Sequence, residues 1–322
     1  MIAWQVAELG RPLDAMTLRQ NLEQPVPGEG QLLVKVRAAA VNFPDALMAA
    51  GLYQVRPPLP FTPGLELCGE VVDGPRAGER VIGTAVLPAG AFAEYALVDA
   101  AAALPAPDSL DDAEAATLLI AYQTAWFALH RRARIAPGET LLVHAAAGGV
   151  GSAAVQLGKA AGATVIAVVG GAAKAEVARQ LGADVVIDRK VEDFVAAVKD
   201  ATGGRGADVV YDPVGGSAYT GSTKCIAFEG RIVVVGFASG EIPAPPLGHA
   251  LVKNYSVLGL HWNLYNVQDP AAVVACHREL TDLAAKGVVR PLISERLPLD
   301  AAADAVHRVA GGSTTGRIAI LP

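Results

Sequence analysis

The residues best suited to chemistry form a glycine-rich stretch, HAAAGGVG, at positions 144–151. It follows the apolar run TLLV and precedes a helix-like stretch, SAAVQLGKAAGA. A strand-to-helix turn with so little side chain leaves space at the helix N-terminus, where unpaired N–H groups and a partial positive charge favour a pyrophosphate. In the pattern G-x-G-x-x-G, Gly148 and Gly151 take the second and third places, and Ala146 takes the first.

This pattern predicts a dinucleotide-binding turn, and a glycine-rich turn without a ligand is the alternative interpretation. The residues expected to border the pyrophosphate are Ala147, Gly148, Gly149, Val150 and Gly151.

The next apolar run, TVIAVVGG, indicates which dinucleotide would bind. A site for NAD usually has an acidic residue at this position to bind the ribose hydroxyls. Here the run ends in Gly170 and Gly171, Lys174 follows, and the later run VVIDRK provides Arg189 and Lys190. A missing carboxylate with nearby cations favours a 2′-phosphate, so we predict NADPH, bound in part by Gly170, Gly171, Lys174 and Arg189. The alternative is that these cations are ordinary solvated charges.

The elements that position these residues follow a regular rhythm. Helix-like segments separate apolar strands that are expected to begin at Leu141, Val165, Val185, Val209 and Ile232. Successive β-α-β units require a parallel sheet covered by helices on both faces, so the pattern predicts a doubly wound α/β domain. The first hundred residues instead contain short strands between Pro and Gly, typical of a partly closed antiparallel barrel.

The rhythm stops after NYSVLGL, and the remaining chain contains an amphipathic helix, a short helix and a final strand. We therefore expect the C-terminal segment to return to the first domain. The predicted division is a catalytic domain of residues 1–118 and 262–322 and a nucleotide-binding domain of residues 119–261.

Composition excludes several classes of protein. The 322 residues are 52% hydrophobic and 18% charged, which is far from a disordered chain. The net charge of −6 argues against nucleic-acid and anionic-membrane binding. Three scattered cysteines, Cys68, Cys225 and Cys276, make a disulfide framework or a structural zinc lobe improbable. The N-terminus lacks a signal-peptide pattern, and no membrane span is expected, so we predict a cytoplasmic protein.

Several segments resemble a known family in order along the chain: VNFPD, GLY, PFTPGLELCGEV, YQTAW, HAAAGGVG, DVVYDPVGG and VVGFASGEIP. Together they resemble the zinc-independent quinone oxidoreductases (the zeta-crystallin-like family) of the medium-chain dehydrogenase/reductase superfamily. The resemblance covers essentially the whole chain. It implies a GroES-like, partly open β-barrel catalytic domain, a Rossmann domain with a doubly wound parallel sheet, and a cleft between them. It also implies NADPH as the hydride donor and a homodimer joined at the edge strand NYSVLGL.

The resemblance places Asn42, Asp45 and Tyr53 in the substrate cleft. Asn42 would bind the nicotinamide ribose or a substrate oxygen, and the Tyr53 phenol would donate to a developing oxyanion. Asp45 would orient neighbouring groups. The alternatives are that Asn42 and Asp45 only shape a turn and that Tyr53 only packs at a rim.

The resemblance adds further cofactor contacts. They are Thr124, Gly236, Phe237, Ala238 and Arg317. Helix packing is the alternative for Thr124, and an exposed strand end is the alternative for Arg317. Arg189 stands where relatives usually have a tyrosine, and this change should preserve the 2′-phosphate contact.

Zinc-dependent relatives have a cysteine in the place of Asn42 and a histidine in the place of Leu65. We therefore predict no metal, because Asn42 and Glu66 alone make a poor zinc site. A plain carbonyl needs a Lewis acid to stabilise the oxyanion, whereas a quinone or an enone spreads that charge over its own π-system. The absence of the usual zinc ligands therefore indicates that the hydride acceptor is a conjugated carbonyl compound.

Three functions remain open. The first is an NADPH-dependent reductase of quinones. The second is an enoyl reductase acting on enones or enoyl thioesters, although the cleft segment GLYQVRPPLP offers only Arg56 as a basic residue. The third is an NADPH-binding protein with a structural or RNA-binding role, and the acidic net charge argues against RNA.

Overall fold

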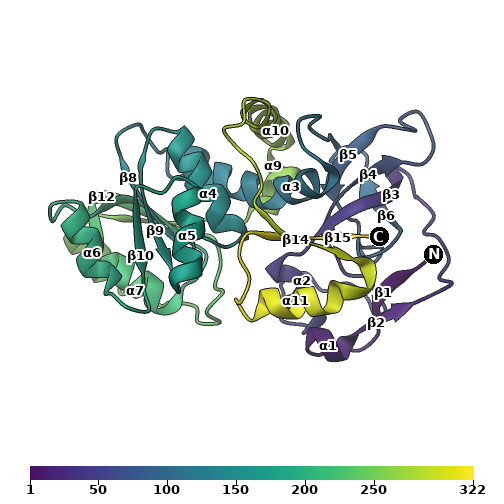
Figure 1. Cartoon of the computed structure of the whole chain (residues 1–322), viewed down its shortest axis with the longest axis horizontal. Coiled ribbons are helices and arrows are strands. Elements are labelled where there is room, and N and C mark those ends of the chain that lie inside the picture. Colours follow the sequence, from purple (N-terminus) through teal and green to yellow (C-terminus); the bar gives the residue numbers. More distant parts are fainter. The chain divides into compact units, whose positions relative to one another are not determined.

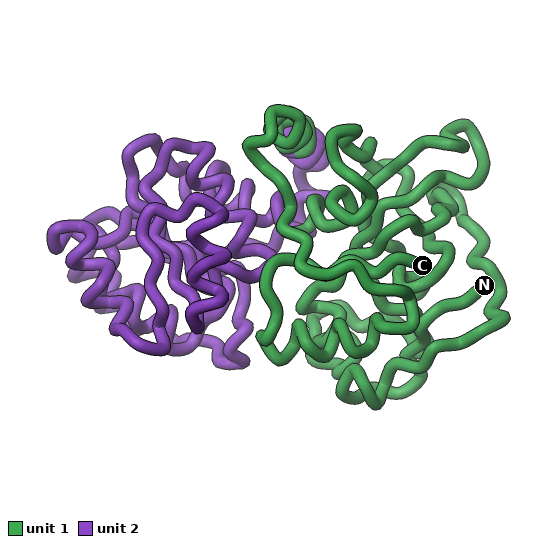
Figure 2. The backbone as a smooth tube through the Cα atoms, in the orientation of Figure 1, with its two compact units in different colours: residues 1–120, 277–322 green, residues 121–276 purple.

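The computed structural model describes all 322 residues and divides them into two compact units (Figure 2). Unit 1 contains Met1–Ile120 and His277–Pro322, and unit 2 contains Ala121–Cys276. The C-terminal segment returns to the first unit. It does so at His277, whereas the sequence boundary is placed at residue 262.

The segment between these two boundaries packs inside unit 2. Trp262 donates its indole N–H to the Gln123 side chain across 3.0 Å. The rings of Tyr265 and Phe127 lie 4.1 Å apart, and Arg131 pairs with Asp269. Sequence periodicity marks where strands stop, but it does not show where these later residues pack.

Unit 2 is built on a six-stranded parallel sheet in the order β10-β9-β8-β11-β12-β13 (Figure 1). Its strands are β8 (Thr140–His144), β9 (Thr164–Val169), β10 (Val185–Asp188), β11 (Ala207–Asp212), β12 (Ile226–Val234) and β13 (Ser256–Gly259). The helices between them are α4 (Gly149–Ala160), α5 (Ala172–Gln180), α6 (Phe194–Ala201), α7 (Gly216–Cys225) and α8 (Leu247–Lys253). Helices α4 and α5 cover one face of the sheet, and α6 and α7 cover the other (Figure 1). This is the doubly wound Rossmann arrangement that the sequence predicts.

The central strands of this sheet are buried on both faces. Every residue of β8 is buried, as are nearly all residues of β9 and β11, because helices cover both sides. The helices end where glycines permit a positive φ, for example Gly162 after α4 and Gly182 after α5, at +76° and +91°. Each of these glycines is followed by an alanine, and each Gly-Ala pair marks the end of a helix.

Unit 1 contains a seven-stranded sheet in the order β14-β15-β3-β4-β5-β7, with β6 also paired to β3. Its strands are β3 (Gln31–Ala40), β4 (Glu66–Val71), β5 (Arg80–Thr84), β6 (Tyr95–Asp99), β7 (Leu104–Pro105), β14 (Ile293–Pro298) and β15 (Arg317–Leu321). All pairs are antiparallel except β14 with β15. The partly open barrel expected for the GroES-like domain is confirmed.

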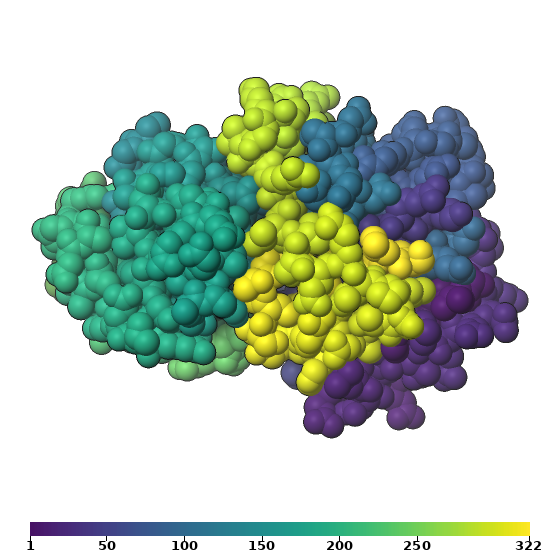
Figure 3. Space-filling view, in the orientation of Figure 1, coloured from purple at the N-terminus to yellow at the C-terminus, as the bar shows by residue number.

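The remaining elements of unit 1 contribute side chains to its core. They are β1 (Ala3–Val6), β2 (Met16–Arg19), α1 (Pro12–Ala15), α2 (Phe43–Ala49), η3 (Leu299–Ala301) and α11 (Ala302–Ala310). The C-terminal residues, yellow in Figure 3, lie against the purple N-terminal residues of the same unit. Trp4 fixes this contact by donating its indole N–H to the carbonyl of Leu299 across 2.6 Å.

Two long helices carry the chain from one unit to the other. They are α3 (Asp112–Trp126), which continues as the π-helix η1 (Phe127–Arg132), and α10 (Pro270–Ala285), which follows η2 (Trp262–Leu264) and α9 (Tyr265–Gln268). No helix of the structure is long and apolar enough to span a membrane.

Candidate active site

The glycine-rich turn joins β8 to α4 in unit 2. Gly148 is the N-cap of α4, and its extended backbone starts a helix whose first N–H groups have no intrahelical partner. A Cβ at Gly151 would overlap the carbonyl oxygen of Ala145, so only glycine fits at that place. Ala145 has a φ of +48°, a left-handed conformation that turns the chain one residue before Ala146, which takes the place of the usual first glycine. The turn therefore leaves the helix N-terminus open.

The loops after β11 and β12 lie at the same carboxyl edge of the sheet. The buried carboxylate of Asp212 accepts hydrogen bonds from the N–H groups of Val214 and Gly215, at 2.8 and 3.0 Å. Ala238 N–H donates to the carbonyl of Pro213 across 3.0 Å, which ties the two loops together. Ligands of doubly wound sheets bind at this edge. Gly236 and Phe237 thus lie at the position expected for a nicotinamide.

A buried histidine, His144, lies at the same carboxyl edge of the sheet. His144, the last residue of β8, is 2% exposed, and its Nε2 lies 2.8 Å from the Ser222 hydroxyl. Burial lowers the pKa of His144 to about 4, despite the opposing charge of Asp212, so the imidazole is neutral. The sequence analysis does not single out His144 or Asp212, because their contact depends on β8 and β11 being neighbours.

The end of β9 gathers the cations that the sequence predicts. A Cβ at Gly170 would lie 3.5 Å from the Nε and Nη2 atoms of Arg189. Lys174 lies in the first turn of α5, and burial together with the positive charges of Arg189 and Lys190 lowers its pKa. The predicted pair of cations is thus brought together beside the glycines.

Thr124 lies on α3 and is 8% exposed. Its neighbour Gln123 is fully buried, accepts from Trp262, and has an amide nitrogen without a partner. The helix then continues as a π-helix, a form found often at functional sites.

In unit 1, Asn42 and Asp45 form a capping box at the start of α2. Asn42 N–H donates to Asp45 Oδ2 across 2.8 Å, and Gly64 N–H donates to Oδ1 across 3.2 Å. Complete burial raises the pKa of Asp45 to about 7 against these hydrogen bonds. Because both oxygens accept backbone hydrogen bonds, Asp45 is suited to holding the loops in place.

The amide of Asn42 continues this network to an ion pair. Its Nδ2 donates to the carbonyl of Ala40 and to Glu66 Oε2, at 3.2 and 3.1 Å. Glu66 Oε2 also accepts from Arg317 across 2.6 Å, and Oε1 accepts from Ile120 N–H across 2.6 Å. Arg317 is 5% exposed, so the alternative of an exposed strand end is wrong.

These contacts do not fit a zinc ion. The places of two usual ligands are occupied by Asn42 and Leu65, and the Glu66 carboxylate is already bound by a guanidinium, an amide and a backbone N–H. A site for zinc favours several thiolate or imidazole ligands. The structure contains no group of three His, Cys, Asp or Glu residues that could hold a metal.

Tyr53 lies in the loop after α2 and is partly buried against the core of unit 1. Burial and the nearby Asp45 carboxyl raise the pKa of Tyr53, which keeps its hydroxyl protonated at neutral pH. The phenol is therefore in the form that can donate a hydrogen bond.

The residues of unit 2 fit a dinucleotide. The open N-terminus of α4 suits a pyrophosphate, and the cations beside Gly170 suit a phosphate on the adjacent ribose. NADPH would supply a hydride when bound. The chain's own contribution would be to hold and orient it.

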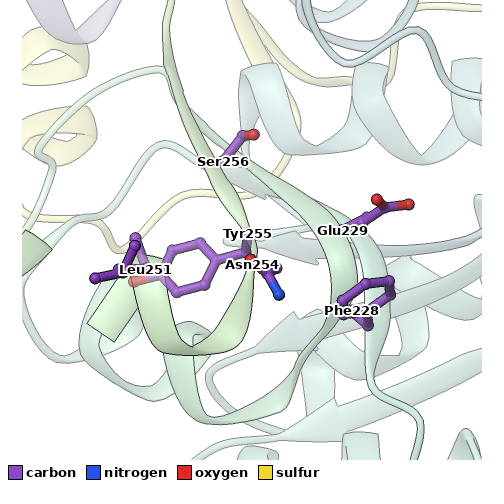
Figure 4. Close-up of a pocket in the computed structure, with 7 residues that line it drawn as sticks. Phe228, Glu229, Leu251, Asn254, Tyr255 and Ser256 are labelled. Atoms are coloured by element: carbon purple, nitrogen blue, oxygen red, sulfur yellow. The ribbon is translucent and has the colours of Figure 1, made fainter. Parts of the chain in front are cut away.

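A solvent-exposed hollow lies elsewhere, on unit 2. It has a volume of about 710 Å³ and is open to solvent at the edge strand β13 (Figure 4). It is lined by Phe228, Glu229, Ala250, Leu251, Asn254, Tyr255 and Ser256. This hollow has exposed apolar side chains and no catalytic groups that converge on it. It is therefore distinct from the candidate active site.

Comparison with known proteins decides the family. An alcohol dehydrogenase GroES-like domain matches residues 28–108, and a zinc-binding dehydrogenase domain matches residues 149–276. A quinone oxidoreductase-like protein 2 homolog from Nematostella vectensis is 37% identical over 97% of this chain and 87% of its own length. The chain belongs to the quinone oxidoreductase-like family. The zinc-independent branch of the medium-chain dehydrogenase/reductase superfamily, which the motifs resemble, is thereby confirmed.

Solved structures agree with this family. The Escherichia coli quinone oxidoreductase, solved as a complex with NADPH, has a TM-score of 0.92 and 30% identity, with full coverage of both chains.

A mycocerosic acid synthase-like polyketide synthase of Mycobacterium tuberculosis is 31% identical over 97% of this chain, which matches 15% of that protein. This quinone oxidoreductase-like chain thus also resembles one part of a much larger enzyme.

Proposed function

We propose that this protein is an NADPH-dependent oxidoreductase that transfers hydride to quinones or other conjugated carbonyl acceptors without zinc. The observation that carries the proposal is the occupied carboxylate of Glu66. Its contacts with Arg317, Asn42 and Ile120 occupy the carboxylate that would otherwise be the remaining candidate metal ligand beside Asn42. An acceptor must then stabilise most of the negative charge itself.

The proposed roles divide between the two units. In unit 2, the turn at residues 147–151 binds the pyrophosphate, the cations near Gly170 bind the 2′-phosphate, and residues 236–238 border the nicotinamide. In unit 1, the Tyr53 hydroxyl donates a hydrogen bond to the acceptor oxygen. Asn42, Asp45 and Arg317 keep the surrounding loops and strands in position, which their buried hydrogen bonds support.

A second candidate is reduction of enones or enoyl thioesters. The similarity to part of a polyketide synthase favours it, since such enzymes handle acyl thioesters. The chemistry is closely related, because hydride again arrives at a carbon conjugated to a carbonyl. The exposed Arg56 is the basic residue of the loop that follows α2.

We also propose a homodimer in the cytoplasm. Strand β13 is the last strand of its sheet and leaves one backbone edge unpaired. Helix α8 beside it has no buried side chain, and Phe228 and Leu251 are 71% and 79% exposed. A second copy that pairs along β13 would cover these apolar groups.

A screen of acceptors tests the function. NADPH oxidation is measured with a para-quinone, a cyclic enone, an enoyl thioester and a saturated ketone. The proposal expects turnover with the quinone and the enone and none with the saturated ketone. A preference for the thioester would favour the second candidate, and binding of NADPH without turnover of any acceptor would favour a structural role.

A further inference from the structure

The loop after β10 lies directly against the turn after β9. Asp188 at the end of β10 pairs in register with Val169 at the end of β9, so the residues that follow the two strands meet. Arg189 N–H donates to the carbonyl of Val169 across 3.0 Å. Arg189 and Lys190 are therefore held opposite the glycine pair at the end of β9.

The side chain of Asp188 joins the two segments a second time. Its Oδ1 accepts from Gly171 N–H across 2.8 Å and from Lys190 N–H across 3.0 Å. The hydrogen bond from Gly171, then that from Lys190, lowers the pKa of Asp188, so the carboxylate is charged at neutral pH. Asp188 N–H donates in turn to Glu192 across 3.0 Å. The carboxylate thus acts as a fixed link between the turn and the loop.

This link places the Lys190 ammonium over the glycine turn. A Cβ at Gly171 would lie 3.7 Å from Lys190 Nζ, just as one at Gly170 would lie 3.5 Å from the Arg189 guanidinium. Gly171 has a φ of +106° and is the N-cap of α5. Lys174 follows in the first turn of that helix, and its lowered pKa reflects burial first and then Arg189 and Lys190.

Three cations at one helix N-terminus repel each other and oppose the helix dipole. None of the protein's salt bridges involves Arg189 or Lys190. The nearby Asp188 carboxylate offsets part of this repulsion, and a doubly charged phosphate bound among the cations would offset more of it. The geometry therefore suits a dianion better than a neutral ribose.

We propose that Lys190 is a third cation of the 2′-phosphate site and that Asp188 is the positioning residue that holds it there. This inference rests on the proposed use of NADPH. It adds a residue that determines cofactor specificity to the predicted pair of Lys174 and Arg189.

Binding of NADP⁺ and NAD⁺ to the full chain tests the role of Lys190, because the two ligands differ only in the 2′-phosphate. Calorimetry is carried out on the wild type, Lys190→Ala and the control Lys224→Ala, which removes an exposed cation of α7. Lys190→Ala should weaken NADP⁺ binding by roughly tenfold, as expected for one lost charge-assisted contact, and leave NAD⁺ binding unchanged. Lys224→Ala should change neither affinity. NAD⁺ binding also reports whether each variant is folded.

Two variants at Asp188 test the positioning role. Asp188→Ala removes the acceptor of both N–H groups and should reduce the preference for NADP⁺ several-fold. Asp188→Asn keeps an acceptor oxygen at Oδ1 and should retain the preference. An equal loss of the preference for NADP⁺ over NAD⁺ in the two variants would overturn the positioning role of Asp188.

The remaining outcomes separate this inference from the proposed function. If the wild type prefers NADP⁺ and Lys190→Ala keeps that preference, the role of Lys190 is wrong and the use of NADPH stands. If the wild type binds NADP⁺ and NAD⁺ equally well, the use of NADPH itself is wrong.

Discussion

The guanidinium of Arg317 donates to the carboxylate of Glu66 across 2.6 Å, and the two side chains are 5% and 0% exposed. Arg317 begins β15 and Glu66 begins β4, and β3 lies between these strands in the sheet. The ion pair thus spans a strand and connects the C-terminal segment to the first half of unit 1. Its burial leaves neither charge accessible to water.

Breaking this pair should be costly. Arg317→Met leaves a buried carboxylate without its cation and should lower the free energy of unfolding by about 3–5 kcal/mol. The double variant Glu66→Gln with Arg317→Met removes both charges and should be less destabilised than the single variant. Urea denaturation measures both effects.

The half-exposed pair of Arg37 and Glu70 provides a matched control. Arg37→Met should cost at most about 1 kcal/mol, because water screens that pair. Equal costs at Arg317 and Arg37 would contradict the importance assigned to the buried pair.

Asp45 should make stability depend on pH. Burial raises the pKa of its carboxyl from 3.8 to about 7. The pKa of Asp45 is higher in the folded state than in the unfolded state. Its contribution to the free energy of unfolding is therefore fully present below about pH 4 and is lost as the pH rises to about 7. Relative to Asp45→Asn, the wild type should therefore lose unfolding free energy between these values and show no further change at higher pH.

Urea denaturation at several pH values measures this difference. Asp73→Asn, at an exposed position, is the control and should give a curve parallel to that of the wild type. Parallel curves for Asp45→Asn as well would rule out a raised pKa at Asp45.

The sequence was sufficient to predict the β-α-β rhythm of unit 2, because glycines at helix ends and fully buried strands leave a strong local pattern. It also placed Gly151 correctly in a turn that excludes a side chain. These features depend on residues close together in the chain. Local patterns therefore predicted most of the nucleotide-binding fold.

The sequence could not pair residues that are far apart in the chain. The sequence indicates Glu66 only as a weak metal ligand, and the family resemblance indicates Arg317 only as a residue near the cofactor or at an exposed strand end. Their contact exists because β15 returns to pair with β3, which no local pattern encodes. The link from Asp188 to Gly171 likewise leaves no local sequence pattern, since it depends on β9 and β10 being neighbours.

Tyr53 should affect the acceptors unequally. Tyr53→Phe removes the hydroxyl that we propose as the donor to the acceptor oxygen, and loss of such a donor can reduce turnover by about a hundredfold or more. A quinone stabilises more charge itself, so we expect roughly a tenfold loss or less with a quinone and about a hundredfold loss with a cyclic enone.

Steady-state NADPH oxidation by the wild type and Tyr53→Phe measures both losses, and NADPH affinity should change little. An unchanged enone rate in the variant would remove Tyr53 from the mechanism.

The exposed apolar surface at β13 should form the dimer contact. Leu251→Glu introduces a charge there and should convert a mass of two chains, measured by light scattering, to a mass of one. Val191→Glu changes a side chain of similar exposure (80%) outside the β13 hollow and should remain dimeric. A wild-type mass of one chain at micromolar concentration would contradict the dimer.

Hydride transfer to a conjugated acceptor should proceed without zinc. The most direct measurement is NADPH oxidation by chelator-dialysed protein of known zinc content, with a para-quinone and a saturated ketone as acceptors. We expect a quinone rate unchanged by dialysis, substoichiometric zinc and no reduction of the ketone. Stoichiometric zinc in the purified protein, with the quinone rate lost when that zinc is removed, would contradict it.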